Sequence, residues 1–393
     1  IATGRDAWSY NSNKPTLENN FNNCIAVFNG QIDARKRDPE GFERENDPSK
    51  IKWTRGLVNQ LNKGLKSPQF EQNSVFTALY RPFFKQNLYN EKIWLDMTYQ
   101  MPKLFPFEGA ENLAIATLTL VGKDFTCLMS DRICDLALLR FGTQCFPRYL
   151  YRKLEEGEVA QGLVINGYER TDAITAQALE QFKAAYPQNA AAIDADAVFY
   201  YVYGVLNHPD YCSTYANNLQ KELPRIPRVA TYADFKAIAD AGRALAQLHV
   251  GYEQVKPYDG CELVYAKGVN AANMDYRVTK LQYGKLKGKS YSQGKDKSII
   301  IYNKDLTIKN IPLEAQEFVV ASQSALDWVV ERYAVTMDKG SRIVNDCNKF
   351  DNDPRYILNL LLRIITVSLE TLKIRQAMPK LKLHPLEQQQ ASL

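Results

Sequence analysis

The chain has 393 residues, of which 45% are hydrophobic and 24% charged, and 49 Lys and Arg against 44 Asp and Glu give a net charge of +5. These values are typical of a globular protein and exclude collagen-like and disordered chains. No segment has the roughly 18 uncharged apolar residues that a membrane span needs, so we expect no membrane partner. The length is sufficient for two or three domains with a sizeable buried core.

Cysteine usage and the start of the chain predict a cellular context. The seven cysteines are an odd number without a C-x-x-C pair, which indicates reduced thiols and a cytoplasmic location. The chain begins at Ile1 without a start Met or a signal sequence, so we expect a piece of a longer polypeptide rather than a secretory precursor. Catalytic domains would then lie outside these residues.

Residues 1–168 are expected to form an N-terminal α/β part. A helix is predicted from Leu17 to Asn29, and the charged stretch from Ala34 to Pro48 predicts a loop or hinge. Between Val75 and Tyr149, short apolar runs are bounded by prolines and glycines. This pattern predicts a sheet with some helical segments.

Residues 169–260 change to a helical period and predict a helical subdomain. One helix is expected from Asp194 or Asp196 to Leu206, and another from Thr231 to Tyr252, because these polar residues are suitable N-caps. The stretch from residue 151 to 260 is acidic, with ten basic and fourteen acidic residues.

Residues 261–312 supply the basic excess of the whole chain, with ten basic and four acidic residues. They are β-branched, Lys-rich and interrupted by glycines, which predicts a strand pair or a small antiparallel β-ribbon. Residues 313–393 predict a C-terminal helical part, with helices over Glu314–Val320, Ser324–Tyr333 and Pro354–Gln376. The fold class expected from all four parts is α+β, with a mixed sheet, a helical subdomain, a small antiparallel ribbon and C-terminal helices.

Two motifs resemble catalytic sites but have simpler explanations. "GKLKGKS" (Gly284 to Ser290) is one residue short of a phosphate-binding loop and no helix follows it, so a basic turn is favoured. Asp210 and Asp234 match a loose pattern of metal-dependent nucleases, but both stand where aspartates cap helices. No His lies at ligand spacing from a Cys or carboxylate. We therefore predict no catalytic residue, no metal site and no cofactor site in this chain.

Two segments rich in aromatic, cationic and amide side chains are candidates for nucleic-acid contact: Tyr80–Asn87 and Gln144–Lys153. Guanidinium, ammonium and amide groups can bind base edges or phosphate oxygens. The alternative is that the aromatic rings belong to the core and the arginines pair with carboxylates. The DNA-contact candidates from these segments are Arg81, Lys85, Gln86, Asn87 and Arg148.

The basic ribbon supplies a second set of candidates. Its lysines are too many to pack together without a counter-anion, and DNA phosphates would provide one, although a solvated face is an open alternative. The candidates are Lys280, Gln282, Lys285, Lys287, Lys289, Lys295 and Lys297.

Longer motifs then suggest a family. The chain contains "RDAWSYN" (Arg5 to Asn11), "LYRPFFKQNLY" (Leu79 to Tyr89), "LMSDRICDLALL" (Leu128 to Leu139), "GSRIVND" (Gly340 to Asp346) and "DPRYILNLLLRIITVSLETLKI" (Asp353 to Ile374). With several others in the same order, these motifs resemble the C-terminal target-recognition region of the type ISP restriction-modification enzymes. The resemblance extends over nearly the whole chain.

The resemblance implies a mixed-sheet module that recognises a specific double-stranded DNA sequence. It would direct adenine N6 methylation and ATP-driven translocation and cleavage, all carried out by other parts of one bacterial, cytoplasmic polypeptide. S-adenosylmethionine, ATP and Mg²⁺ would bind those parts, whose signature motifs are absent here. The expected partners are duplex DNA and the methyltransferase domain of the same polypeptide, and the expected state is a monomer. Residues that contact bases are expected in Gln86 to Lys92 and Lys280 to Lys297.

Two other functions stay open on the sequence alone. A free-standing DNA-modifying enzyme would have to use the two loose catalytic motifs. A protein-interaction scaffold would use the acidic helical subdomain as its binding surface.

Overall fold

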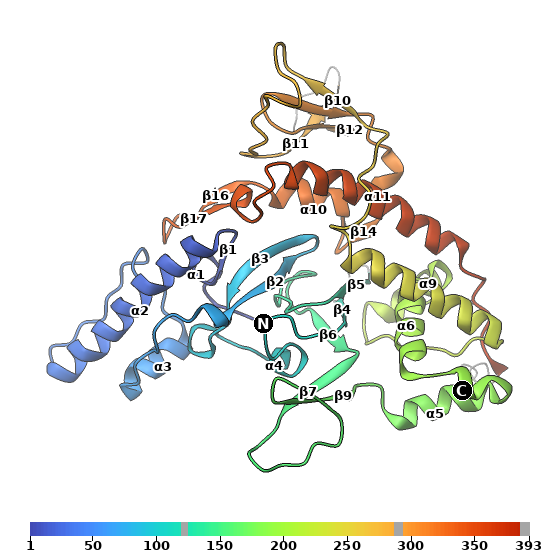
Figure 1. The fold of residues 1–393 in the computed structure, drawn as a ribbon, viewed down its shortest axis with the longest axis horizontal. Helices are drawn as coiled ribbons and strands as arrows, with labels where there is room; N and C mark the ends of the chain where they lie inside the picture. Colours follow the sequence, from blue (N-terminus) through green and yellow to red (C-terminus); the bar gives the residue numbers. More distant parts are fainter. Residues whose placement is uncertain (119–124, 287–293, 386–393) are drawn as a thin grey trace.

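The computed structural model describes residues 1–118, 125–286 and 294–385, and its architecture is α+β (Figure 1). Small antiparallel sheets occupy the centre, with helices at both ends of the long axis and a separate sheet at the top of the view. This architecture confirms the predicted fold class. No helix within the three described ranges is long and apolar enough to cross a membrane.

The helices have the following bounds: α1 Asp6–Ser9, α2 Lys14–Arg37, α3 Arg55–Lys63, α4 Met101–Leu104, α5 Ala176–Ala185, α6 Ala195–Leu206, α7 Pro209–Thr214, α8 Ala216–Leu219, α9 Tyr232–Val250, α10 Ala325–Arg332 and α11 Tyr356–Ala377.

The strands form several antiparallel sheets and hairpins. A three-stranded sheet has the order β1 (Tyr10–Asn11), β3 (Phe84–Tyr89), β2 (Val75–Arg81), and a second has the order β5 (Thr126–Ser130), β4 (Ala114–Leu118), β6 (Gln144–Pro147). A third has the order β7 (Tyr149–Lys153), β9 (Tyr168–Asp172), β8 (Leu163–Ile165), and a four-stranded sheet has the order β10 (Glu262–Tyr265), β13 (Leu306–Lys309), β12 (Lys295–Ile301), β11 (Gln282–Lys285). The two hairpins are β14 (Val319–Val320) with β15 (Gln323–Ser324) and β16 (Val335–Met337) with β17 (Val344–Asp346).

Strand β3 is the middle strand of its sheet and is buried along its whole length. Leu88 belongs to the largest hydrophobic core, whereas the next residue, Tyr89, packs with α2 and α3. Successive side chains of a strand point to opposite faces, so β3 is covered on both sides. This burial makes three predicted DNA contacts in β3 inaccessible, as described below.

Helix α2 is longer than the sequence predicted. It starts after the N-cap Asn13 and ends at Arg37, whereas the prediction ended it at Asn29 and began a loop at Ala34. The apolar stripe continues to Ile32, which is buried, and a run of basic residues occupies the last turn. Cations are favourable at a helix C-terminus, which supports the extra turns.

The predicted helical subdomain is present, and its capping residues are largely as expected. Asp194 caps α6 and Thr231 caps α9 through side-chain acceptance of a backbone N–H. The two helices cross at Gly204 and Gly242, where a Cβ on Gly242 would lie 1.9 Å from the carbonyl oxygen of Tyr200. The glycines therefore permit the close approach of the two helices.

Helices α10 and α11 lie between the β10–β13 sheet and the central sheets (Figure 1). Helix α11 buries apolar residues on nearly every side, as a helix in the middle of a core does. The predicted ribbon is a four-stranded sheet rather than a strand pair. The prediction of a helix over Glu314–Val320 is wrong, because buried Phe318 and Val320 lie in an extended segment that pairs in β14 after a short 3-10 turn.

The boundaries of the four predicted parts stay a prediction. The β10–β13 strands all fall within residues 261–312, and α5 to α9 fall within 169–260. The largest hydrophobic core nevertheless combines residues from all four parts.

Candidate nucleic-acid interface

Three predicted DNA contacts lie in the buried strand β3. Gln86 has 0% of its surface exposed; its side chain donates to Ser12 Oγ (2.9 Å) and accepts from Asn345 Nδ2 (2.8 Å). Asn87 is also buried and donates to the carbonyl oxygens of Asn11 and Ser12. Their amides are satisfied inside the protein, so the structure argues against the predicted contact with DNA bases.

Lys85 is the third of these residues, and it too faces inward. Its Nζ lies 2.7 Å from Glu253 Oε2, and its side chain is 8% exposed. Burial and the nearby Arg132 charge lower the pKa of Lys85, and Glu253 offsets part of this effect. The lysine is committed to an internal ion pair and is not positioned to meet a phosphate.

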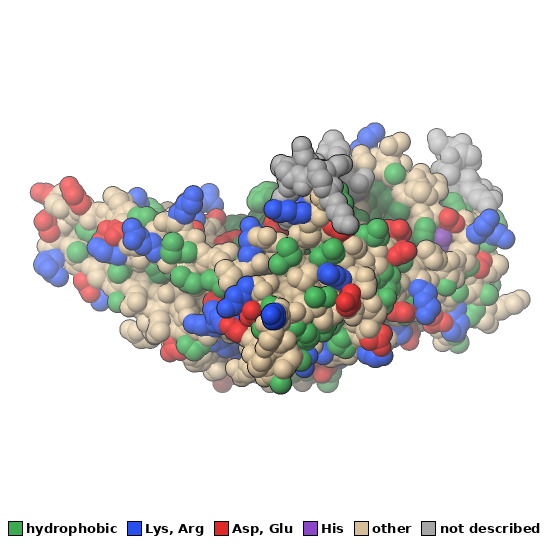
Figure 2. Space-filling model, turned by 90° about the horizontal axis from the view of Figure 1, so that it is seen from above, with side chains coloured by type: hydrophobic (Ala, Val, Ile, Leu, Met, Phe, Trp, Pro, Cys, Tyr) green, Lys and Arg blue, Asp and Glu red, His purple; other side chains and the backbone are tan. Residues whose placement is uncertain are grey.

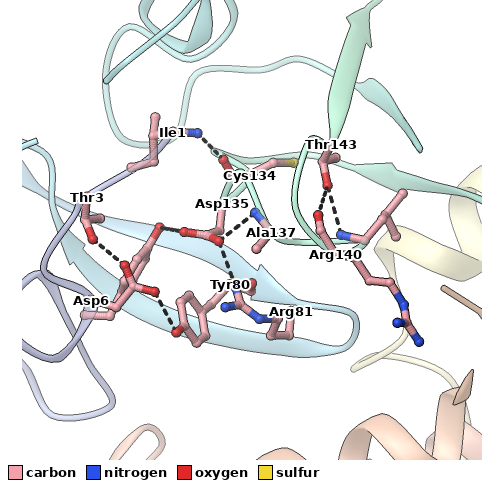
Figure 3. Close-up of polar contacts among 12 residues, drawn as sticks. Ile1, Thr3, Asp6, Tyr80, Arg81, Cys134, Asp135, Ala137, Arg140 and Thr143 are labelled. Carbon is pink, nitrogen blue, oxygen red and sulfur yellow. Dashed lines mark hydrogen bonds and ion pairs between the residues drawn. The ribbon is translucent and has the colours of Figure 1, made fainter. Parts of the chain in front are cut away.

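Both predicted arginines pair with carboxylates, as the alternative interpretation of their segments expected. Arg81 Nη1 lies 2.8 Å from Asp135 Oδ1 (Figure 3). Tyr10 donates to the other oxygen of the same carboxylate. Arg148 is buried and bridges Asp172 (2.5 Å) and Asp196 (2.6 Å). Their guanidinium groups therefore hold the fold together and are not open to a ligand in this conformation.

A cavity of about 640 Å³ contains Arg148 in its lining, next to Tyr149, Arg170 and Asp196. Arg148 is neutralised by its two aspartates, and Arg170 stacks on the ring of Tyr149 (4.3 Å). Because the cations here already have partners, nothing in the lining indicates a site for a phosphate.

The exposed candidates are on the β10–β13 sheet and the segment leading into it. Gln282, Lys285 and Lys295 are exposed on the neighbouring strands β11 and β12, and Lys280 is exposed just before β11. Lys285 and Lys295 are directly paired in the β11–β12 register. Lys287 and Lys289 lie outside the described residues. Four of the seven ribbon candidates are thus exposed on, or just before, two neighbouring strands.

Lys297 has a different role from its neighbours. Its Nζ lies 2.8 Å from Asp327 Oδ2, and Tyr283 donates to Oδ1 of the same carboxylate (2.9 Å). Partial burial opposes ionisation of Asp327, but the hydrogen bonds from Lys297 and Tyr283 outweigh it and lower the pKa of the carboxyl. Asp327 also forms a capping box with Ser324 at the start of α10, so this cluster attaches the sheet to that helix.

Sequence reasoning missed further exposed cations outside this sheet. Arg277 is 56% exposed although it pairs with Asp346, and Lys339 and Arg342 are exposed in the turn between β16 and β17. The signal available for Arg342 was its place in the family-like "GSRIVND" stretch. Figure 2, which looks onto this end of the molecule, shows Lys and Arg side chains interspersed with acidic and hydrophobic ones.

Among the described residues, no three His, Cys, Asp or Glu side chains are grouped so that they could hold a metal ion. Asp234 lies in the first turn of α9 and accepts from the capping Thr231, and Asp210 accepts from the backbone of Leu381. The predicted capping role is wrong for both aspartates, because the N-caps are Thr231 for α9 and His208 for α7. Each carboxylate nevertheless has a hydrogen-bond partner within the fold. The prediction that this chain alone is not an enzyme stays a prediction.

Comparison with known proteins identifies the family. The sequence pattern of the Type ISP C-terminal specificity domain matches residues 1–360. The chain belongs to this family, which confirms the resemblance noted in the sequence. A comparison with curated proteins finds no match.

Several solved structures are similar to nearly the whole chain. They include a nuclease-deletion mutant of the Type ISP restriction-modification enzyme LlaGI in complex with a DNA substrate mimic (TM-score 0.80, 32% identity). The ATP-dependent Type ISP restriction-modification enzyme LlaBIII bound to DNA gives a TM-score of 0.83 at 32% identity, and the DrdV–DNA complex gives 0.77 at 32%. Each similarity covers 98% of this chain but only 33%, 23% and 36% of the LlaGI, LlaBIII and DrdV chains. The chain therefore spans about a quarter to a third of the length of these relatives.

Proposed function

We propose that this chain recognises a specific sequence in double-stranded DNA. The observation that carries the proposal is its membership of the specificity-domain family, together with a fold shared over 98% of its length with enzymes solved on DNA. At 32% identity the similarity extends beyond the fold to the sequence itself.

The geometry supports a phosphate-binding role for the exposed face of the β10–β13 sheet. Lys280, Lys285 and Lys295 would contact phosphates, and the exposed amide of Gln282 is suited to a base edge or a phosphate. Asp327 fixes the orientation of this sheet through Lys297 and Tyr283 without using the exposed lysines. Of the predicted contacts that the structure describes, we retain Lys280, Gln282, Lys285 and Lys295.

The rest of a longer polypeptide would carry out the chemistry. We propose a parent restriction-modification enzyme of a bacterial cytoplasm, a monomer, in which a methyltransferase domain contacts this chain and methylates adenine N6. S-adenosylmethionine, ATP and Mg²⁺ would bind the parent's methyltransferase, motor and nuclease parts. The described residues of this chain provide no group of metal ligands, so no step of that chemistry is assigned to them.

The test is duplex binding by the parent polypeptide at several salt concentrations, with the double variant Lys285→Gln/Lys295→Gln. We expect the logarithm of the affinity to fall with the logarithm of salt by about 0.9 for each neutralised phosphate, so the variant should flatten this slope by up to about 2. Lys183→Gln/Lys236→Gln, in the helical subdomain, removes the same charge and should leave the slope unchanged. Salt-independent binding of the unaltered protein, or equal slopes for all three proteins, would contradict the proposal.

A further inference from the structure

The hairpin of β16 and β17 exposes apolar side chains at its outer end. Met337 is 61% exposed and Val344 is 45% exposed, and the two form the last cross-strand pair before the turn. The turn that follows exposes Lys339 and Arg342. Within the described part of the chain, neither cation forms an ion pair, although the charge of Arg342 acts on the carboxyl of Asp47. The hairpin therefore presents two apolar groups and two exposed cations together.

The turn itself is held rigid by internal hydrogen bonds. The carboxylate of Asp338 accepts from the backbone N–H (2.8 Å) and the hydroxyl (2.9 Å) of Ser341, which keeps the pKa of Asp338 below its usual range. The N–H of Arg342 donates to the carbonyl oxygen of Asp338 (2.8 Å), and Arg342 itself has φ +59°. An L residue in this left-handed conformation needs such support from its surroundings, so the turn is fixed before any partner binds.

Strand β17 is attached to the central sheet by the buried amides of β3 and its neighbours. Asn345 accepts from the N–H of Ser12 (2.9 Å) and donates to Gln86 Oε1 (2.8 Å), and Asn11 donates to the carbonyl oxygen of Val344 (3.1 Å). Gln86, which the sequence had suggested as a DNA contact, therefore positions the hairpin instead.

The hairpin is also continuous with the basic sheet. The N–H of Val335 donates to the carbonyl oxygen of Thr279 (3.0 Å), and Lys280 is bridged to Ala334. The exposed side chains of Arg277 and Lys280 thus lie beside the start of the hairpin, on the segment that leads into β11. Both elements occur on the upper side of the molecule in Figure 1.

We propose that the β16–β17 hairpin is a second DNA-contacting element, with Met337 and Val344 entering a groove and Lys339 and Arg342 on the flanking phosphates. A two-stranded ribbon fits the major groove of duplex DNA, and apolar side chains there can contact thymine methyl groups. A protein surface is the other occupant for an apolar pair, but two exposed flanking cations favour a polyanion. The proposal rests on the proposed DNA-recognition function and names a new element that carries it.

Two sets of variants in the parent polypeptide test this role. Lys339→Gln/Arg342→Gln should weaken binding to all duplexes and flatten the salt slope by up to about 2. The matched control is Lys221→Gln/Arg225→Gln, which also removes one Lys and one Arg from the surface. These two residues follow α8 in the helical subdomain, so this variant should leave the slope unchanged. Met337→Ser/Val344→Ser should reduce the preference for the target over a scrambled duplex while keeping the wild-type salt slope. All substituted side chains are exposed, and an unchanged thermal unfolding midpoint would verify folding.

The outcomes separate this proposal from the function on which it rests. Reduced slope in the first variant and reduced target preference in the second, with a silent control, would support a DNA-contacting hairpin. Wild-type binding by both hairpin variants, alongside weakened binding by Lys285→Gln/Lys295→Gln, would overturn the hairpin proposal and leave DNA recognition standing. Absence of duplex binding by the unaltered parent polypeptide would overturn both.

Discussion

Lys85 and Glu253 form an ion pair between strand β3 and the segment after α9. Glu253 also accepts from the hydroxyl of Tyr356 (2.7 Å), so its carboxylate links β3 to α11. Breaking a buried pair by removing one partner leaves an uncompensated charge, which is much more costly than replacing both partners.

We therefore expect Lys85→Met to lower the free energy of unfolding by about 3 kcal/mol, and Glu253→Gln added to it to restore part of the loss. Urea denaturation of the single and double variants measures both effects. The exposed Lys92→Met is the control and should change stability by less than about 0.5 kcal/mol. A Lys85→Met protein as stable as the control would show that this lysine is not held in the interior.

His249 is buried between α6 and α11 and connects them. The N–H of Met129 donates to the hydroxyl of Tyr203, which is hydrogen-bonded to His249 Nδ1 (2.6 Å), and His249 Nε2 is hydrogen-bonded to Thr371 Oγ1 (2.9 Å). Burial, followed by the charge of Arg375, lowers the pKa of His249 from 6.5 to about 3.

This shift predicts a pH dependence of stability. Between about pH 6.5 and 3 the unfolded chain binds a proton at His249 that the folded protein does not, so stability falls with falling pH by about 1.4 kcal/mol per pH unit. Above pH 6.5 the contribution is fully present. Denaturation at pH 7 and pH 5 should show a smaller loss for His249→Asn than for wild type, whereas parallel losses would mean that this imidazole titrates normally.

For helices and strands, the sequence predicted local features such as helix caps better than it predicted which strands pair with each other. The caps Asp194 and Thr231 were identifiable because an N-cap depends on a few neighbouring residues. The burial of β3 was not, because it depends on pairing with β1, more than 70 residues away in the chain. The sequence of β3 therefore resembled a DNA-binding segment, whereas its amide side chains are buried in the core.

The α6–α9 crossing gives a test at the same scale. A Cβ on Gly242 would lie 1.9 Å from the Tyr200 carbonyl oxygen and 2.7 Å from Gly204 N, whereas a Cβ on Gly30, in α2, would meet nothing within 4 Å. Gly242→Ala should destabilise the protein by about 3 kcal/mol or more through overpacking, and Gly30→Ala should stabilise it by about 0.5 to 1 kcal/mol. Thermal unfolding of the two variants measures whether each substitution destabilises or stabilises the protein. A tolerated Gly242→Ala would be incompatible with the close crossing.

For the whole molecule, the charge distribution along the chain was more informative than its sum. The excess of ten basic over four acidic residues in 261–312 located the β10–β13 sheet correctly as the basic part. The β16–β17 hairpin escaped detection because its cations are contributed by a segment of balanced charge, and its base joins the sheet only through the contacts at Thr279 and Lys280. Surface continuity of this kind is a property of the folded chain.

The central claim is that this chain determines which DNA sequence the parent polypeptide acts on. The most direct measurement is the position of N6-methyladenine in the DNA of a methylation-free bacterial host that expresses the parent polypeptide. In a second strain, residues 1–393 are replaced by the corresponding segment of a relative that methylates a different sequence. We predict that the methylated sequence changes to that of the relative. Methylation of the original sequence by the exchanged protein would contradict the account.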